Sequence, residues 1–174
     1  MRARHAAALV LAAATAVAGA GRADGVPKGA TYIIQLTSSQ YSSGLGEYLV
    51  PPLSRALERA GLRSRGGPGA DLVATVESAS DVGAWYPGRD GREWLYTRTV
   101  TVGLSPADAD VEPEGRLQPW FAVGARIRTP DEDRVDELEC LIALAVRVAV
   151  VRYRERGSVL VDGGGCARPS ARSP

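Results

Sequence analysis

The chain of 174 residues carries 21 basic and 20 acidic side chains, and 45% of its residues are hydrophobic. Nucleic-acid binders usually concentrate basic residues on one surface, and this balance favours no nucleic-acid partner. The single histidine, His5, lies in a segment that we expect to be removed, so the mature protein is predicted to lack Ser-His-Asp, Cys-His and histidine-zinc chemistry. We therefore expect a protein that is not an enzyme and that uses no cofactor or metal.

The amino-terminal residues 1–23 have the pattern of a secretory signal peptide. Arg2 and Arg4 provide a basic start, residues 6–20 form an apolar run, and small residues follow for a cleavage enzyme. The run is shorter than the roughly 20 residues that cross a bilayer. We expect an exported protein, periplasmic or secreted, with no transmembrane helix in its mature chain.

The remainder of the chain has the length of one domain. We expect this domain to span residues 24–162, followed by a flexible tail at residues 163–174. A chain of this size buries roughly 70% of its unfolded surface, so it can fold around an apolar core without a metal.

The first elements of the domain are a strand and a helix. Residues 32–37 combine aromatic and β-branched side chains, which favours a strand. Apolar residues then recur at helical spacing over residues 45–60, and Gly61 suits the position just past the helix end. Pro51 and Pro52 interrupt the pattern, so we expect a kink or a restart there.

The middle of the chain favours antiparallel strands. Glycines and a proline predict a loop over residues 64–70, and a strand is expected at residues 71–77. Turn residues between two aromatic pairs predict a hairpin centred on Asp90-Gly91. Residues 95–104 then alternate between polar and apolar side chains, which is typical of a strand with one buried face.

A further strand and a long helix follow. We expect the strand at residues 120–128. Thr129 can cap a helix, Pro130 fits its first position, and Glu132 completes a capping box. The helix that follows is apolar on two sides, which predicts burial on both sides or contact with a partner. Its β-branched content leaves open a strand at residues 146–154.

Two cysteines, Cys140 and Cys166, lie outside the signal segment. An oxidising compartment permits a disulfide between them, and closing this loop would stabilise the fold by roughly 3 kcal/mol. Cys140 lies on the narrow polar strip of the long helix, where the tail can reach it. A buried thiol with an unpaired tail thiol remains the alternative. Residues 158–161 are expected to add a short edge strand.

The order of these elements, β-α-β-β-β-α, predicts an α+β fold. We expect a mainly antiparallel sheet of about four strands with two helices packed on one face. Four segments carry a resemblance: Tyr32-Ile33-Ile34, Leu57-Glu58-Arg59-Ala60-Gly61, Ala70-Asp71-Leu72-Val73 and Trp94 to Leu104. With them, the layout over residues 31–153 resembles small exported accessory and lipoprotein-type domains of the bacterial cell envelope, whose function is unknown. The lipid-acceptor cysteine of such lipoproteins is absent after the apolar run.

The predicted hairpin carries the strongest candidate for a binding site. Flat aromatic faces beside guanidinium groups can stack on sugar rings or anchor a protein partner. The competing interpretation is cross-strand aromatic pairing that only holds the hairpin together. The candidate residues are Trp85, Tyr86, Arg89, Arg92, Trp94 and Tyr96.

Three other segments have a functional and a structural interpretation. The acidic loop at residues 108–114 offers oxygen ligands for calcium or is simply solvated. The acids at residues 131–137 offer a pair of carboxylates for glycoside cleavage or serve the helix start. The apolar helix at residues 138–151 either docks on a partner, including a second copy, or is covered by the sheet.

We therefore expect an exported, non-catalytic binding or accessory domain of the cell envelope. Its expected partner is an envelope protein or a cell-wall glycan. The alternatives are a carboxylate-dependent hydrolase and a structural subunit that assembles through its carboxy-terminal helix, with homo-oligomers left open.

Overall fold

The computed structural model describes residues 25–36, 40, 44–109, 119–131 and 133–167. The expected signal peptide and the end of the expected tail lie outside these residues. The described elements are, in chain order, β1 (Thr31–Ile34), α2 (Leu45–Arg59), β2 (Arg63–Ser64), β3 (Leu72–Ser80), β4 (Ala84–Gly88), β5 (Gly91–Pro106), β6 (Phe121–Thr129), α3 (Val135–Arg152), η1 (Tyr153–Glu155), β7 (Gly157–Asp162) and η2 (Gly164–Cys166).

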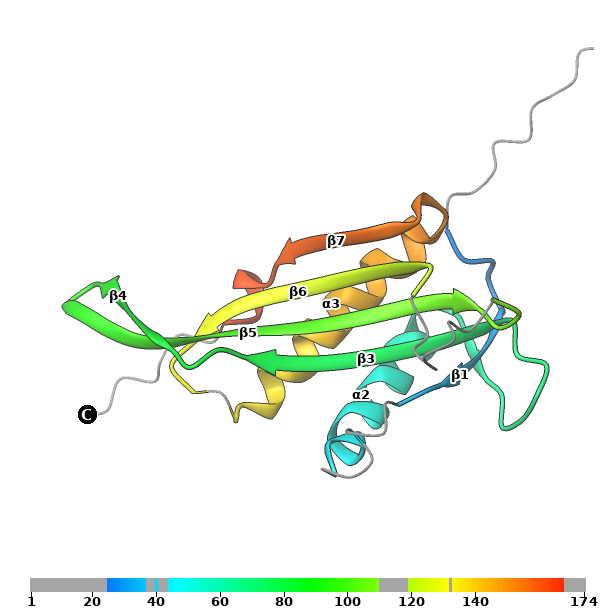
Figure 1. Ribbon diagram of the computed structural model, residues 1–174, viewed down its shortest axis with the longest axis horizontal. Coiled ribbons are helices and arrows are strands. Elements are labelled where there is room, and N and C mark those ends of the chain that lie inside the picture. Colours follow the sequence, from blue (N-terminus) through cyan, green and yellow to red (C-terminus); the bar gives the residue numbers. More distant parts are fainter. Residues whose placement is uncertain (1–24, 37–39, 41–43, 110–118, 132, 168–174) are drawn as a thin grey trace, which may run out of the picture.

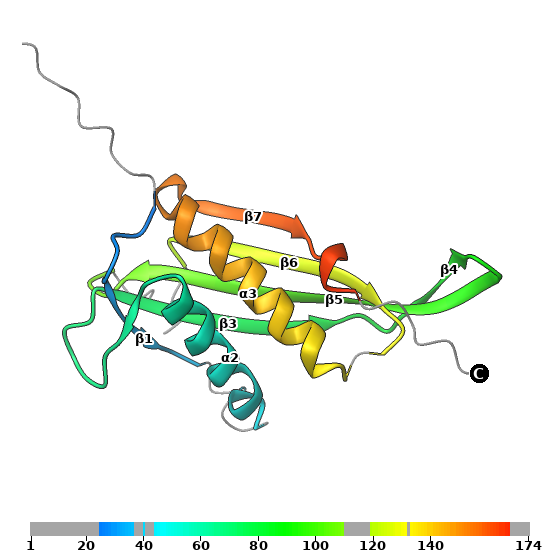
Figure 2. The same ribbon diagram turned by 180° about the vertical axis from the view of Figure 1, so that it is seen from behind.

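The fold consists of one layer of sheet and one layer of helix. Helices α2 and α3 lie side by side on the same face of the sheet, and the opposite face carries no described helix (Figures 1 and 2). The strand order is β2-β1-β3-β5-β6-β7, and β4 pairs with β5. The expectation of an α+β fold with both helices on one face is confirmed.

The sheet is larger and less uniform than the sequence predicts. Seven strands are described where about four were expected, and the sheet is mixed rather than mainly antiparallel. The pairs β1–β2, β1–β3 and β6–β7 are parallel, whereas β3–β5, β4–β5 and β5–β6 are antiparallel. A parallel neighbour requires a crossover, and α2 and α3 provide the crossovers that lead to β3 and β7.

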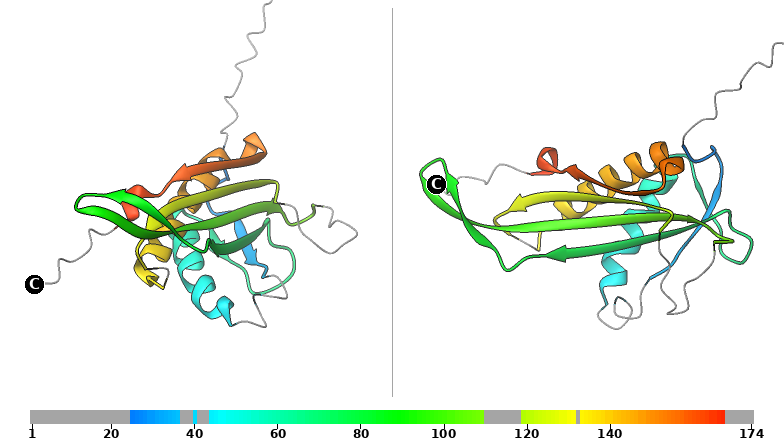
Figure 3. Two further views of the ribbon diagram at one scale, coloured as in Figure 1. Left: turned by 60° about the vertical axis from the view of Figure 1, so that its left-hand side comes forward. Right: turned by 45° about the horizontal axis from the view of Figure 1, so that its top comes forward.

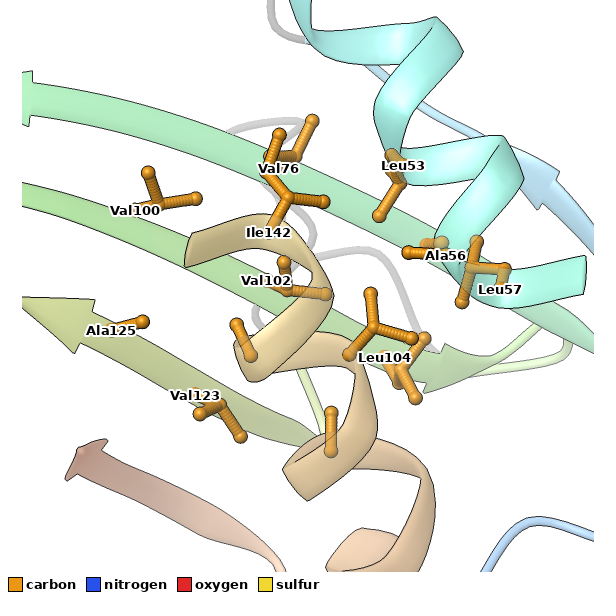
Figure 4. Close-up of a cluster of buried hydrophobic side chains, with 14 of the residues drawn as sticks. Leu53, Ala56, Leu57, Val76, Val100, Val102, Leu104, Val123, Ala125 and Ile142 are labelled. Atoms are coloured by element: carbon orange, nitrogen blue, oxygen red, sulfur yellow. The ribbon is translucent and has the colours of Figure 1, made fainter. Parts of the chain in front are cut away.

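The hydrophobic core lies between the sheet and the two helices. Alternate residues of β5 and β6 face the helices, so the alternation in the sequence indicates the buried face correctly. Figure 4 shows side chains from three strands meeting those of both helices. The fully buried members include Leu53, Leu57, Val100, Val102, Leu104, Val123 and Ile142.

Helix α2 departs from the prediction at its centre and agrees with it at its end. It is continuous through Pro51 and Pro52, so the expected restart does not occur, and the alternative of a kink stays a prediction. The prolines lack N–H groups for the carbonyls of Glu47 and Tyr48, and both of these residues are exposed, so water can replace the missing donors. Past the helix end, Gly61 has a φ of 91°, as the sequence predicted.

Helix α3 begins later than predicted. Thr129 does not cap it, because Thr129 is the fully buried last residue of β6. Its hydroxyl accepts a hydrogen bond from the Asp131 amide (3.3 Å) and donates one to the Asp131 carbonyl (3.0 Å), which closes a turn instead. The helix starts at Val135, and Glu132 of the expected capping box lies outside the described residues. The alternative strand at residues 146–154 is wrong, since α3 continues to Arg152.

The carboxy-terminal part of the domain returns to the sheet and is cross-linked to α3. The expected edge strand is confirmed as β7, which pairs with β6. Cys140 and Cys166 form the predicted disulfide, with their Cα atoms 5.7 Å apart. Of the expected flexible tail, Gly164–Cys166 forms the short helix η2.

Candidate functional site

The candidate site begins at the junction of β3 and β4, which contains one residue more than the part of β5 that it faces. Ser80, the last residue of β3, pairs with Arg98 of β5, and Ala84, the first residue of β4, pairs with Leu95. Residues 81–83 therefore face only two residues of β5. This is a β-bulge, which bends a strand and increases its twist. The paired arms beyond it extend past the part of the sheet that the helices cover (Figures 1 and 3).

The side chain of Asp81 holds the bulge in place. Its Oδ1 accepts hydrogen bonds from the backbone amides of Thr97 (2.7 Å) and Gly83 (2.9 Å). The amide of Asp81 also donates to the Thr97 carbonyl at 3.1 Å. The bond from Thr97, followed by that from Gly83, lowers the pKa of the Asp81 carboxyl below its usual value. The extra residue itself, Val82, is 90% exposed.

The turn at the tip of the hairpin is displaced by one residue from its predicted centre. Gly88 pairs with Gly91, so Arg89 and Asp90 form a two-residue turn where Asp90-Gly91 was predicted. The φ of Gly91 is 137°, in the region that favours glycine. We call β4, this turn and residues 91–95 of β5 the aromatic hairpin.

Trp85 and Trp94 form the centre of the aromatic hairpin. They are directly paired across β4 and β5, and their ring centroids lie 5.4 Å apart with an interplanar angle of 78°. This edge-to-face geometry is favourable for aromatic rings. Trp85 nevertheless remains 61% exposed and Trp94 40% exposed. A Cβ on Gly83 would lie 2.5 Å from Nε1 of Trp94, so the missing side chain at this position lets the indole pack against the backbone.

Tyr86 lies on the other face of the hairpin, since neighbouring residues of a strand point to opposite sides. The guanidinium carbon of Arg128, in β6, lies 4.3 Å from the centroid of the Tyr86 ring, which is a cation-π contact. The sequence pattern indicated Arg89 and Arg92 as the arginines beside the hairpin aromatics and did not indicate Arg128. The polar positions of β6 indicate that Arg128 points away from the core. Its partner Tyr86 is 42 residues away in the chain, so local spacing does not indicate this contact.

The remaining predicted site residues surround this centre without joining it. Arg89 lies in the turn and Arg92 is paired with Pro87, and both arginines are exposed. Tyr96 is half-buried at the base of the hairpin, where it pairs with Thr129. The structure thus brings Trp85 and Trp94 together and distributes the other predicted side chains around them.

The acidic candidates are explained by local structure where they are described. Glu137 is buried, and its Oε1 lies 2.9 Å from Nη1 of Arg134. Asp131 accepts a hydrogen bond from the Asp133 amide at 3.0 Å. Within the described ranges, no three His, Cys, Asp or Glu side chains are grouped so that they could hold a metal ion. Most of the expected calcium loop, from residue 110 on, lies outside these ranges.

Two hollows open on the side of the helices. A basic one of about 490 Å³ is lined by Lys28, Arg59 and Arg63, together with small residues. A more apolar one of about 700 Å³ lies along α2 and α3 and includes the disulfide, with Asp162 as its single carboxylate. Neither hollow contains the two carboxylates that a glycosidase needs. No described helix is long and apolar enough to span a membrane.

The comparisons with known proteins are distant. No family model matches the chain, and no curated protein matches it. A minor lipoprotein from Acinetobacter baumannii is 16% identical over 72% of this chain and 92% of its own, with a TM-score of 0.41. A PDZ domain protein from Parabacteroides distasonis is 12% identical over 74% of this chain, with a TM-score of 0.37, and this chain spans 32% of its length. At these TM-scores the likeness assigns no function.

Proposed function

We propose that this protein is an exported, non-catalytic binding domain of the cell envelope that engages a protein partner through the aromatic hairpin. The observation that carries the proposal is the exposure of the paired Trp85 and Trp94 on an arm that extends beyond the covered sheet. Tryptophan, tyrosine and arginine dominate the binding energy of protein interfaces. The aromatic hairpin combines all three.

Hydrogen bonds and packing restrain the hairpin before it binds. Asp81 fixes its base through two backbone amides, and the indole of Trp94 packs against Gly83. A partner therefore loses little affinity to ordering this surface. Burying the exposed part of a side chain as large as Trp85 would contribute about 3 kcal/mol.

The arrangement of the rings favours a protein over a glycan. A sugar ring stacks on a flat, open aromatic face, whereas Trp85 and Trp94 meet edge to face at 78°. The contact between Tyr86 and Arg128 adds a second surface on the other side of the hairpin, and this surface carries the positive charge of Arg128. Such a two-sided shape matches a cleft or a pair of loops on a protein.

The first test is photo-crosslinking in cells from position 92, next to the tryptophan pair, followed by mass spectrometry of the captured species. We expect one dominant protein adduct. Trp85→Ala should abolish this adduct and leave the melting temperature nearly unchanged, because Trp85 is largely exposed. Tyr48→Ala is the matched control, since Tyr48 is also 61% exposed but lies on α2. It should leave the adduct intact.

Three outcomes would contradict the proposal. A folded, exported protein that gives no adduct from position 92 would exclude the aromatic hairpin as a binding site. A glycan adduct would retain the site but replace the partner class. Unfolding of Trp85→Ala would mean that the tryptophan pair serves packing rather than recognition.

A further inference from the structure

Strand β7 ends the sheet and presents an unshared edge. The amides of Gly157 and Gly163 donate to carbonyls of Trp120 and Arg126, at 3.0 and 2.7 Å, so the odd-numbered residues of this strand face β6. Because backbone groups alternate along a strand, the N–H and C=O groups of Ser158, Leu160 and Asp162 point away from the sheet. No described strand pairs with them.

Apart from Asp162 at its end, this edge lacks the features that keep exposed edges from pairing. Natural sheets protect their edges with charged side chains, prolines, bulges or very short strands. Strand β7 is six residues long, and Ser158 to Val161 are uncharged and contain no proline. Leu160 is 52% exposed on the face without helices. At the opposite edge of the sheet, by contrast, β2 has only two residues.

The charges at the two ends of β7 indicate which strand fits this edge. Arg156 directly precedes the strand, with its guanidinium carbon 3.7 Å from the centroid of the Trp120 ring, and Asp162 ends it. Pairing with an identical strand in the antiparallel direction would place the Arg156 end of each strand beside the Asp162 end of the other copy. Parallel pairing would instead bring like charges together. The edge is therefore complementary to itself in one direction only.

We propose that β7 is the interface for a second copy of this chain, which pairs with it antiparallel and joins the two sheets into one. Pairing of Leu160 with its own counterpart places Ser158 opposite Asp162, and both of these pairs use the outward-pointing backbone groups. On the helix side, Val159 faces Val161 of the other copy, a favourable pair of β-branched residues. The interface is independent of the aromatic hairpin.

The direction of pairing determines where the two hairpins lie. Tyr96, at the base of the aromatic hairpin, pairs with Thr129 at the end of β6, and β6 runs parallel to β7. The hairpin therefore lies beyond the carboxyl end of β7. In the antiparallel dimer the two aromatic hairpins extend from opposite ends of a shared sheet.

Sedimentation equilibrium of the mature chain tests the proposal. We expect the mass of a dimer that dissociates on dilution. Leu160→Pro removes the outward N–H without affecting the bonds to β6, because edge strands accept proline where the amide faces solvent. Two donors are lost per dimer, so the dissociation constant should rise by about 30-fold or more. Leu160→Thr keeps the amide and should leave the dimer largely intact.

Amide hydrogen exchange of the unaltered protein gives a readout that does not depend on a variant. In the dimer, the amides of Leu160 and Asp162 should be protected at high concentration and should exchange faster on dilution. The amides of Val159 and Val161 face β6, so their exchange should depend much less on concentration.

Three results would overturn the proposal. A monomer at all concentrations up to several hundred micromolar would exclude the interface. A dimer that Leu160→Pro leaves unchanged would place the contact elsewhere, for example in the apolar hollow along α2 and α3. Protection of Leu160 that does not change on dilution would mean that the chain covers this edge itself.

Discussion

Single carboxylates fix the positions of whole strands in this protein. Asp81 holds the bulge at the base of the aromatic hairpin, and Asp71 holds the first residue of β1. Oδ2 of Asp71 accepts hydrogen bonds from both the amide and the hydroxyl of Thr31, each at 2.7 Å. These bonds to Thr31 lower the pKa of Asp71. Both acids are exposed, so their importance lies in the backbone groups that they bind rather than in burial.

The lowered pKa of Asp81 leads to a dependence of the hairpin on pH. A carboxyl whose folded pKa lies below its usual value of 3.8 stabilises the fold above that value, and this stabilisation is lost as the pH falls through the folded pKa. We expect Asp81→Asn to speed exchange of the Thr97 amide several-fold at pH 7, because a neutral acceptor binds the amide more weakly. The effect should shrink once wild-type Asp81 is protonated.

Asp90→Asn provides the control for this measurement. Asp90 is exposed at the tip of the same hairpin, within the turn. This substitution should leave exchange of the Thr97 amide unchanged, both at pH 7 and at a pH low enough to protonate wild-type Asp81. An equal effect of the two substitutions would show that net charge, rather than the hydrogen bonds of Asp81, stabilises the hairpin.

Among the elements, helix α2 has an end that local rules determine and a continuous centre that depends on tertiary packing. Its end follows local rules: the amides of Gly61 and Leu62 donate to the carbonyls of Glu58 and Leu57, at 2.9 and 3.1 Å, in a Schellman motif. Its continuity through Pro51 and Pro52 does not follow from such rules. Residues on both sides of the prolines, such as Leu49 and Leu53, are buried against the rest of the core.

The end of α2 predicts a specific cost of adding one methyl group. Gly61→Ala should destabilise the fold by about 1 kcal/mol, because a residue with a Cβ is strained at a φ of 91°. Apart from its two chain neighbours, no described residue has an atom within 4 Å of the added Cβ, so the cost should come from the backbone alone. Urea unfolding measures the difference.

Gly66→Ala is the matched control, since its Cβ also meets nothing within 4 Å and its φ is not positive. It should be neutral or slightly stabilising, because alanine restricts the unfolded chain. Equal effects at the two positions would contradict the strain argument at Gly61.

Elements with a strong repeating pattern could be predicted from the sequence, and their partners could not. The alternation in β5 and β6 indicates the buried face because one side of these strands packs against helices. The same information does not reveal that β1 and β2 pair in parallel, since both strands are short. Thr129 has the residue type and spacing of a helix cap, yet its burial within β6 decides its role. The predicted hairpin brought the aromatic residues onto facing strands, whereas the direct pairing of Trp85 with Trp94 and their exposure required the structure.

At the scale of the whole molecule, covalent and non-covalent links secure the last part of the chain. Among the described strands, β7 pairs with β6 alone, and η2 follows it directly. The disulfide between Cys140 and Cys166 attaches this segment to the outer side of α3. Prediction of this link was possible because only two cysteines are present and the helical pattern turns Cys140 away from the core.

Removing the disulfide should lower the free energy of unfolding substantially. The two cysteines are 26 residues apart in the sequence, and opening a loop of this length costs roughly 3 kcal/mol in the chain-entropy model. The double substitution Cys140→Ser with Cys166→Ser should show this loss in urea unfolding, and a reductant should produce a similar loss in the unaltered protein. A reductant should have no effect on the double variant. Unchanged stability after verified reduction would contradict the expectation.

The extra residue at Val82 has a consequence for how this protein can diversify. The register of the hairpin changes at the bulge, so changes in its arms need not move the pairing of β3 with β5. Adding two residues to each arm would lengthen the hairpin's reach by about 7 Å and keep every side chain on its face. Adding one to each arm would exchange the tryptophan face for the tyrosine face. Insertions of an even number of residues in each arm therefore allow related proteins to reach different partners with the same domain.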